Sequence, residues 1–283
     1  MANYQNSKDL TQLTLGKKTN YISKYNADLL QAVPRSLNRN DLELQTNNLP
    51  FQGEDVWYGY ELSWLNPQGK PIVAVAEFRF PCISPNLVES KSFKLYLNSF
   101  NQSTFTSWQQ VEEILAKDLS LTSGAAAKVS LFKVDKASPF EIANVNSNCI
   151  DDIDIVVNNY DYDNLLLKDI QSPKGLIVEE NLVSHLLKSN CLITNQPDWA
   201  SIFIKYKGEK INHQTLLKYI ISFRQHNEFH EQCVERIFTD LSEYGHFEEL
   251  TIFARYTRRG GLDINPFRSS IINTAPNMRT LRQ

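Results

Sequence analysis

Residues 93–102 read Phe-Lys-Leu-Tyr-Leu-Asn-Ser-Phe-Asn-Gln, and residues 216–225 read Leu-Leu-Lys-Tyr-Ile-Ile-Ser-Phe-Arg-Gln. The two stretches share Tyr, Ser, Phe and Gln at four of ten aligned positions, and both keep an apolar helical face. With one gap, Phe105 falls opposite Phe229 further along the chain. We interpret the similarity as a diverged tandem duplication in which each copy contains a helix of this kind.

The same order of elements surrounds both stretches. In the first copy, alternating apolar residues and an Asn-Pro-Gln-Gly turn predict a hairpin, and two helices and a strand follow it. Thr106 with Gln109 fits a capping box at the start of the second helix. The expected elements are strands at 57–65 and 71–80, helices at 89–100 and 106–119, and a strand at 128–134. In the second copy they are a strand at 199–207, helices at 212–223 and 229–241, and a strand at 249–256.

Composition places the chain among ordinary folded proteins. It has 283 residues, of which 42% are hydrophobic and 22% charged, and its net charge of −3 gives no general attraction to nucleic acid or anionic lipid. We find no apolar signal core and no apolar run long enough to cross a bilayer, so we expect a cytoplasmic protein without membrane or direct nucleic-acid partners. The four cysteines lack a Cys-x-x-Cys pair and are expected to be reduced thiols.

The length favours two similar domains. We divide the chain into a polar N-terminal arm over 1–25, a first module over 26–145 and a second module over 176–283. Between the modules, 146–175 carries five aspartates from Asp151 to Asp163 with no Lys or Arg among them. We interpret this stretch as an acidic, solvated linker.

One candidate for chemistry is a thiol close to a carboxyl group. If the chain turns at Asn195–Pro197, the carboxyl of Asp198 comes back toward Cys191. A thiolate is a nucleophile, and a partly desolvated carboxyl keeps its proton near neutral pH and acts as a general acid. The alternative is that Cys191 is a small buried hydrophobe and Asp198 caps a turn before a strand.

A second candidate is Phe229-His230-Glu231 at a predicted helix start. A purine-like ring could stack on Phe229 while Glu231 accepts hydrogen bonds from its N–H groups. Alternatively, Phe229 is a core residue, His230 lies on the surface and Glu231 stabilises the first helical turn.

A third candidate is Arg258-Arg259-Gly260-Gly261, which suits a phosphate group, with Lys91 adding a point charge. A plain basic turn explains these four residues equally well. The chain has no Gly-x-Gly-x-x-Gly or Walker A pattern, so a dinucleotide would bind outside a Rossmann fold.

Zinc is a rival interpretation of the second candidate. His226, His230 and Cys233 are spaced i, i+4, i+7, which places them on one face of an unbroken helix. Against it, Asn227-Glu228 resembles a helix start, which would leave His226 outside the helix.

Together these segments resemble the 7-cyano-7-deazaguanine reductases, the QueF-type nitrile reductases of queuosine biosynthesis, in their long two-module form. The resemblance covers nearly the whole chain beyond the arm. It is carried by Glu89-Ser-Lys-Ser-Phe-Lys-Leu-Tyr, Cys191 with Pro197-Asp198, Ser222-Phe-Arg, Phe229-His-Glu and Arg258-Arg-Gly-Gly-Leu-Asp-Ile-Asn-Pro. It implies an α+β fold of tandem tunnelling-fold modules, with antiparallel sheets, helices on one face, and a barrel formed when chains associate as a homodimer.

The resemblance also implies roles. Cys191 would attack the nitrile carbon to form a thioimide, and Asp198 would protonate the nitrogen. The deazaguanine substrate would be held by Val88, Glu89, Ser90, Phe229, His230 and Glu231. NADPH, two per turnover, would be held by Ser90, Lys91, Arg258, Arg259 and Gly260, with no metal and no flavin.

Two other classes stay open beside this reductase of tRNA-modification biosynthesis. One is a zinc-dependent cyclohydrolase-like enzyme of the same fold acting on a pterin or purine. The other is a module that binds a deazapurine without turnover. In each case one copy carries Glu89-Ser-Lys-Ser and the other carries Phe229-His-Glu, so we expect one composite site, formed within a chain or across a dimer.

Overall fold

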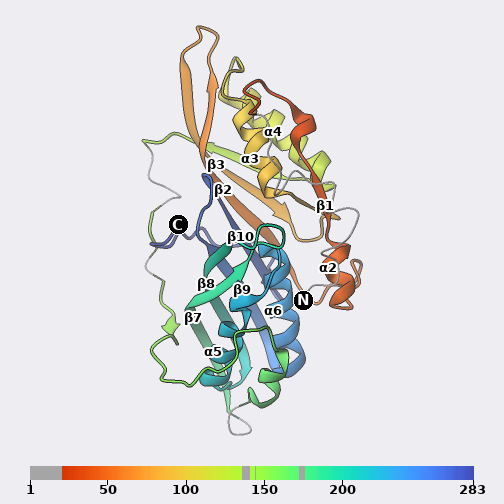
Figure 1. Ribbon diagram of the computed structural model, residues 1–283, viewed down its shortest axis with the longest axis vertical. Helices are drawn as coiled ribbons and strands as arrows, with labels where there is room; N and C mark the ends of the chain where they lie inside the picture. Colours follow the sequence, from red (N-terminus) through yellow and green to blue (C-terminus); the bar gives the residue numbers. More distant parts are fainter. Residues whose placement is uncertain (1–20, 136–140, 144, 172–175) are drawn as a thin grey trace.

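The computed structural model describes residues 21–135, 141–143, 145–171 and 176–283. Residues 1–20 of the expected N-terminal arm therefore lie outside the described residues. The described residues form an α+β structure in which helices pack against one extended sheet (Figure 1). The predicted fold class is confirmed.

Eight strands make up this sheet, in the order β5-β3-β2-β10-β9-β8-β7-β6. All neighbouring strands are antiparallel except the edge pair β6 and β7, which is parallel. A separate two-stranded sheet pairs β1 with β4. The strands are β1 (Ala32–Pro34), β2 (Gln52–Leu65), β3 (Pro71–Pro81), β4 (Asn86–Val88), β5 (Lys128–Phe132), β6 (Asn148–Cys149), β7 (Ile177–Asn190), β8 (Pro197–Glu209), β9 (Phe247–Tyr256) and β10 (Leu262–Ser269).

The helices follow the order expected of two related modules. Module one runs β2, β3, α3, α4, β5, and module two runs β7, β8, α5, α6, β9, β10. The helices are α2 (Ser36–Asp41), α3 (Ser90–Ser99), α4 (Trp108–Ser123), α5 (His213–Ser222) and α6 (His230–Tyr244), with 3-10 turns η1 (Ala27–Leu29), η2 (Asn164–Asp169) and η3 (Phe223–Gln225).

Two long strands, β7 and β10, were missing from the sequence predictions. A register shift between Ser184 and Leu187 interrupts the alternation of β7. All eight residues of β10 are buried, Asp263 and Arg268 included, so this strand has no polar face. Period-2 alternation, the pattern that indicates a half-buried strand, is interrupted in β7 and extends only over residues 262–266 in β10.

The duplication extends beyond the helices. β2 and β7 are both 14 residues long and carry register shifts at Gly59/Leu62 and Ser184/Leu187, eight residues into each strand. In module one, the hydroxyls of Tyr96 and Tyr25 both donate to Asp118 Oδ2, each at 2.7 Å. Module two repeats this pattern, because the hydroxyls of Tyr219 and Tyr162 donate to Asp240 Oδ2 at 2.5 and 2.8 Å.

This repeat corrects the interpretation of 146–175 as a solvated linker. Tyr162 and the turn η2 take the place in module two that Tyr25 and η1 take in module one. Ile150, Leu167 and Ile170 are buried in the core of module two. The described part of the acidic stretch is therefore packed structure. Its buried apolar side chains face the core, and its aspartates are partly or fully exposed.

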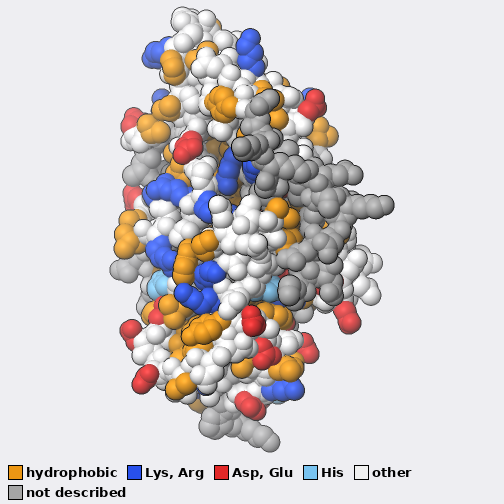
Figure 2. Space-filling model, in the orientation of Figure 1, with side chains coloured by type: hydrophobic (Ala, Val, Ile, Leu, Met, Phe, Trp, Pro, Cys, Tyr) orange, Lys and Arg blue, Asp and Glu red, His pale blue; other side chains and the backbone are white. Residues whose placement is uncertain are grey.

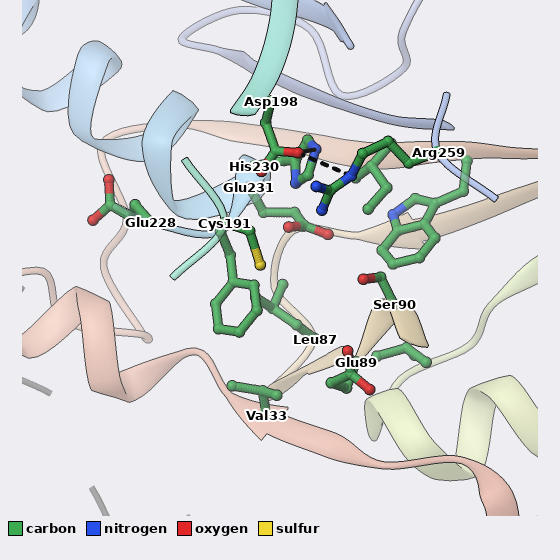
Figure 3. A pocket seen from close by; sticks show the side chains of 14 residues that line it. Val33, Leu87, Glu89, Ser90, Cys191, Asp198, Glu228, His230, Glu231 and Arg259 are labelled. Carbon is green, nitrogen blue, oxygen red and sulfur yellow. Dashed lines mark ion pairs between the residues drawn. The ribbon is translucent and has the colours of Figure 1, made fainter. Parts of the chain in front are cut away.

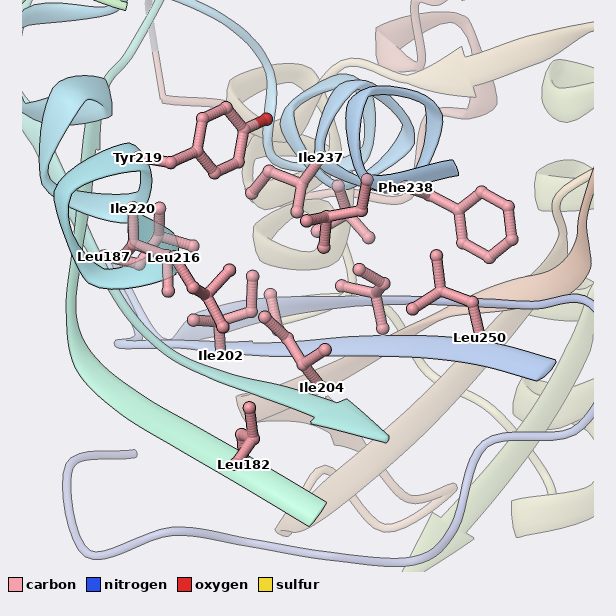
Figure 4. Packing of buried hydrophobic residues seen from close by; sticks show 14 of the residues in the cluster. Leu182, Leu187, Ile202, Ile204, Leu216, Tyr219, Ile220, Ile237, Phe238 and Leu250 are labelled. Carbon is pink, nitrogen blue, oxygen red and sulfur yellow. The ribbon is translucent and has the colours of Figure 1, made fainter. Parts of the chain in front are cut away.

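Each module buries its own core between sheet and helices. In module two, Ile202 and Ile204 on β8 face Leu216 on α5 and Ile237 on α6 (Figure 4). Burying a side chain of this size contributes about 1.5–3 kcal/mol. Module one has the equivalent cluster around Trp57, Phe78 and Phe93.

The predicted capping box of α4 is displaced by one residue. Ser107, not Thr106, is the N-cap, and its hydroxyl accepts from the Gln110 N–H at 3.1 Å. Gln110, not Gln109, reaches back to accept from the Thr106 N–H at 2.8 Å. With Ser107 as its N-cap, α4 aligns with α6 so that Ser107 corresponds to Phe229.

The two modules are joined by a strand pairing and by a buried ionic network. β10 of module two pairs with β2 of module one over eight residues, from Leu262 opposite Gly59 to Ser269 opposite Gln52. Beside this pairing lies a buried ionic network. Its salt bridges are Arg35–Asp55 at 2.5 Å, Arg39–Glu235 at 2.8 Å, Arg268–Asp55 at 2.7 Å and Arg268–Glu235 at 2.8 Å.

No helix within the described residues is long and apolar enough to cross a membrane. The charged side chains, whose sum is −3, are unevenly distributed over the surface. On the face drawn in Figure 2, Lys and Arg side chains gather across the middle of the molecule, and most acidic side chains lie toward its ends.

Candidate active site

A pocket lies where the N-termini of α3 and α6 meet, and both modules contribute to it. It encloses about 390 Å³ of empty space, part of it open to solvent. Residues of both modules therefore meet in one pocket of a single chain. The lining residues are Val33, Trp57, Leu87, Val88, Glu89, Ser90, Cys191, Asp198, Glu228, Phe229, His230, Glu231, Arg259 and Ile264.

Cys191 and Asp198 are held together by a hairpin. Strands β7 and β8 pair up to Asn190 opposite Pro197, and the Cys191 N–H then donates to the Gln196 carbonyl at 2.8 Å. Ser189 pairs with Asp198, and side chains alternate along a strand, so Cys191 and Asp198 face the same side. Asn195 turns the loop with φ of 54°, a conformation that Asn adopts more readily than most residues. The chain therefore reverses as predicted, but over residues 192–195 and not over residues 195–197, because Pro197 already begins β8.

Figure 3 shows the Cys191 sulfur directed into the pocket, between the α6 residues and Leu87. The side chain is buried, at 6% exposure, and Asp198 is more deeply buried at 3%. Both groups are shielded from bulk water but reach the same space.

Asp198 is unusual among the buried acids of this chain. Arg259 Nε lies 3.3 Å and His230 Nε2 3.7 Å from its Oδ1, but neither contact has hydrogen-bond geometry. Among the described residues, no group donates a hydrogen bond to either carboxylate oxygen. A buried carboxyl without a donor is costly unless a ligand completes it.

Glu89 serves a helix and the pocket at once. It is the N-cap of α3, and its two carboxylate oxygens accept from the backbone N–H groups of Lys91 and Ser92, each at 2.7 Å. Burial raises the pKa of Glu89, while these two hydrogen bonds oppose the rise. Each oxygen keeps a lone pair, so the carboxyl can still accept from a ligand.

Glu231 lies across the pocket in the first turn of α6. Burial raises the pKa of Glu231 to about 8, and the nearby Asp55 adds to the rise whereas Arg35 opposes it. Burial also lowers the pKa of His230, although Asp198 opposes this, so His230 is neutral at pH 7. The site therefore holds carboxyl groups whose environments make them unusually ready to carry a proton.

Phe229 shows how α6 differs from its counterpart. Asp118 and Asp240 occupy equivalent positions, which aligns Phe229 with Ser107 rather than with Phe105 as the sequence alignment had it. Ser107 caps α4, whereas Phe229, the N-cap of α6, makes no side-chain capping bond. A missing cap of this kind costs about 1 kcal/mol. In exchange, an aromatic ring lines the pocket beside Val33 and Leu87.

The basic residues are only partly brought together. Arg259 lines the pocket and donates to Gln196 Oε1 at 2.9 Å. Arg258 is exposed instead, with its guanidinium carbon 4.6 Å from the ring centre of Tyr60. Lys91 and Gly260 are not among the lining residues. Gly260 lies in a smaller adjoining hollow with Lys94.

Comparison with known proteins identifies the family of this chain. A family model described as "Nitrile reductase, 7-cyano-7-deazaguanine-reductase N-term" matches residues 21–131, and one described as "QueF-like protein" matches 197–274. The NADPH-dependent 7-cyano-7-deazaguanine reductase of Colwellia psychrerythraea is 66% identical over 286 aligned residues, covering 100% of both chains.

The chain belongs to the 7-cyano-7-deazaguanine reductase family. Among solved structures, the apo form of the archaeosine synthase QueF-Like is 14% identical, with a TM-score of 0.29. The match covers 35% of this chain and 95% of that one. This likeness is too low to support any argument about the site.

In this member of the family, the zinc arrangement does not form. His226 lies outside α6, and its Nε2 is 3.0 Å from Glu228 Oε2. His230 packs edge-on against Tyr256, with ring centres 4.2 Å apart. Burial raises the pKa of the Cys233 thiol well above its usual range. Within the described residues, these three side chains do not gather as a set of metal ligands.

Sequence reasoning missed one residue with a strong tie to this site, Lys94. Burial and Arg259 lower the pKa of Lys94, while Glu89 and Asp198 oppose the change. A Cβ at Gly260 would lie 3.2 Å from its Cδ, so the glycine leaves room for the lysine. The sequence contains a signal for this residue: Lys94 follows Ser90 by four residues, which puts both on one face of α3.

Proposed function

We propose that this chain reduces the nitrile of 7-cyano-7-deazaguanine to the aminomethyl group of 7-aminomethyl-7-deazaguanine, with NADPH, in queuosine biosynthesis for tRNA modification. The observation that carries the proposal is that one pocket holds the buried thiol of Cys191 and the buried carboxyl of Asp198, which has no hydrogen-bond donor among the described residues. The relative's name supplies the substrate and the cofactor.

The thiol solves the main chemical problem. A nitrile accepts hydride poorly, so Cys191 first adds its sulfur to the nitrile carbon and forms a covalent thioimide. The carbon–nitrogen triple bond becomes a double bond, and the carbon becomes electrophilic. Once that carbon has become tetrahedral, the Cys191 sulfur leaves as a thiolate and an imine remains. The imine is then reduced to the amine, and the thiol is ready for another turnover.

Asp198 supplies the proton that sulfur addition requires. As the carbon–sulfur bond forms, the nitrile nitrogen gains an electron pair and needs a proton. Asp198 faces the same side of the hairpin as Cys191 and is shielded from bulk water. A carboxyl in such a position acts as a general acid, worth typically 10²–10⁴-fold in rate. The nearest basic side chains are Arg259 and His230, whose Nε and Nε2 atoms lie 3.3 and 3.7 Å from its Oδ1.

Substrate recognition divides between the modules. Glu89 and Glu231 accept hydrogen bonds from the N–H groups of the deazaguanine, and the ring packs against Phe229. Val88, Ser90 and His230 complete the contacts. Each carboxyl sits at a helix N-terminus, where the helix dipole favours its ionised form when a ligand is bound.

The residues around the pocket suit NADPH. Arg259 is 32% exposed beside the pocket, and Gly260 and Gly261 have φ of 58° and 71° in the turn before β10. Both φ values lie in the left-handed region, which favours glycine, and a Cβ at Gly261 would also displace the Glu61 side chain. Ser90, Lys91, Arg258, Arg259 and Gly260 would hold the cofactor. Bound NADPH supplies hydride, and two are consumed because the change from nitrile to amine takes four electrons.

Three further points come from the resemblance alone. Neither a metal nor a flavin takes part in this reaction. Two chains associate as a homodimer and close a barrel, and the protein works in the cytoplasm. The imine would hydrolyse in water, so we expect the pocket to close over the substrate.

Intact mass spectrometry tests the proposal most directly. The protein is mixed with 7-cyano-7-deazaguanine and no reductant, and we expect a gain equal to the mass of one substrate. Cys191→Ala should lose both this gain and substrate-dependent NADPH oxidation, whereas Cys233→Ala should keep both. Substrate binding with neither adduct nor NADPH oxidation would identify a binding module instead. NADPH oxidation by Cys191→Ala would refute the covalent mechanism.

A further inference from the structure

A second cluster of reactive side chains lies outside the pocket, at the β6 edge of the sheet. Cys149, Asp151 and His185 bring one ligand atom each, a sulfur, a carboxylate oxygen and a ring nitrogen, within 4.8 Å of one another. None of the three lines the pocket. They come from two segments, the β6 turn and the bulge of β7.

The backbone fixes this meeting. β6 runs parallel to β7 with Cys149 opposite Val183, and the Ile150 N–H donates to the Val183 carbonyl at 3.0 Å. Ile150 is buried and anchors the turn. Asp151, the next residue, therefore lies beside Ser184 at the bulge of β7. His185, inside that bulge, is thereby turned toward the same spot.

The surrounding hydrogen bonds hold the ligands in place. Asp151 Oδ1 accepts from the Ser184 hydroxyl at 2.6 Å, and its Oδ2 accepts from the His185 N–H at 2.8 Å. His185 Nδ1 lies 2.7 Å from the Ser201 hydroxyl, which orients the ring. Outer partners of this kind orient the ligands in known metal sites. Both Asp151 oxygens keep a lone pair.

The ligand set suggests the metal. Thiolate, imidazole and carboxylate together suit zinc or cobalt, whereas magnesium and calcium take oxygen ligands. At ordinary zinc bond lengths, the ligand atoms of a tetrahedral site lie about 3.5 Å apart. Closing from 4.8 Å is a small movement for Cys149, whose side chain is exposed. Among the described residues three protein ligands meet here, so water would occupy the fourth position.

We propose that Cys149, Asp151 and His185 bind one divalent cation of the zinc class, which fastens the β6 turn to the bulge of β7. The role is structural and separate from nitrile reduction. The bound metal stabilises the folded chain because it binds the native arrangement and not the unfolded one.

Cobalt is the probe of choice because its thiolate complexes absorb in the near ultraviolet and its tetrahedral complexes absorb in the visible. We expect the reduced, chelator-treated protein to take up one Co²⁺ per chain with a sulfur-to-metal band. Cys149→Ser should lose this band, and His185→Gln should weaken binding at least tenfold. Cys191→Ala and Asp152→Asn, the latter at the exposed acid next to Asp151, should leave both unchanged.

Thermal unfolding gives an independent measurement. Saturating Zn²⁺ should raise the melting temperature of the wild type by on the order of 5 °C, and leave that of Cys149→Ser unchanged. A sulfur band that survives in Cys149→Ser, or that disappears in Cys191→Ala, would overturn the assignment. So would the absence of any band in the wild type. None of these results depends on the reductase activity.

Discussion

At the scale of single residues, Asp198 carries the sharpest expectation. Asp198→Asn keeps the size of the side chain but removes the acid, so sulfur should add to the nitrile 10²–10⁴-fold more slowly. Stopped-flow absorbance of the adduct measures this rate. Alkylation of Cys191 by iodoacetamide should continue in the variant, which separates a lost proton donor from a damaged thiol. An unchanged addition rate would remove Asp198 from the mechanism.

Glu231 predicts the pH dependence of binding. Because its pKa is raised to about 8, most Glu231 is protonated at pH 7 and must lose the proton before it accepts hydrogen bonds from substrate. Affinity should therefore rise as pH increases from 6 to 8, by about tenfold per unit, and level off above 8. Calorimetry with Cys191→Ala, in which no adduct forms, measures it.

The matched control for that titration is Glu231→Gln in the same background. Its affinity should be low and should vary little over this pH range. A parallel rise in both proteins would assign the pH dependence to another group.

The sequence showed these residues but not their surroundings. Motifs and resemblance identified Cys191, Asp198, Glu89 and Glu231, and all four line one pocket. The absence of donors around Asp198 and the influence of Asp55 on Glu231 depend on strands far apart in the sequence. Lys94 was missed because its closeness to Gly260 and the effect of the Arg259 charge on it arise from the folded structure, although its spacing from Ser90 was visible in the sequence.

At the scale of elements, the duplicated helix caps offer a matched pair. Glu89 caps α3 and Asn212 caps α5 at the equivalent position, each accepting from two backbone N–H groups. Glu89→Asn should therefore keep the cap, with a free energy of unfolding within about 1 kcal/mol of the wild type. It should weaken substrate binding at least tenfold, because a charged hydrogen bond worth about 1.5–3 kcal/mol is lost.

Asn212→Ala should do the reverse. It should lower the free energy of unfolding by about 1 kcal/mol and leave substrate binding unchanged. Urea unfolding and calorimetry measure the two quantities. If Glu89→Asn binds substrate as the wild type does, Glu89 is a structural cap only.

Elements with clean periodicity were predicted, and elements with interrupted periodicity were not. Helices α3 to α6 and the β2–β3 hairpin came from apolar spacing and turn chemistry, whereas the short helix α2 was not predicted. β7 was hidden by its bulge and β10 by its buried polar residues. The turn η2 is predictable from the sequence, because Tyr162-Asp-Asn-Leu-Leu-Leu resembles Tyr25-Asn-Ala-Asp-Leu-Leu, the stretch that contains η1.

At the scale of the whole molecule, the buried ionic network makes the two modules one cooperative unit. Glu235 on α6 pairs with Arg39 and Arg268. Glu235→Gln leaves three buried arginines with Asp55 as their main counter-ion, and should cost about 3–5 kcal/mol. Calorimetry should show one transition shifted to lower temperature. Two separate transitions would mean that the modules unfold independently.

Because β2 pairs with β10, one central strand of the sheet is synthesised early and its partner late. The two strands are about 200 residues apart in the chain. On the ribosome, β2 is complete long before its partner exists, so its edge stays bare while most of the polypeptide is still being translated. Trp57 and Ile264, opposite each other in that pairing, both line the pocket. The pocket is thus among the last features to mature, and a nascent chain that stalls before Leu262 has an incomplete pocket and an unprotected strand that invites aggregation.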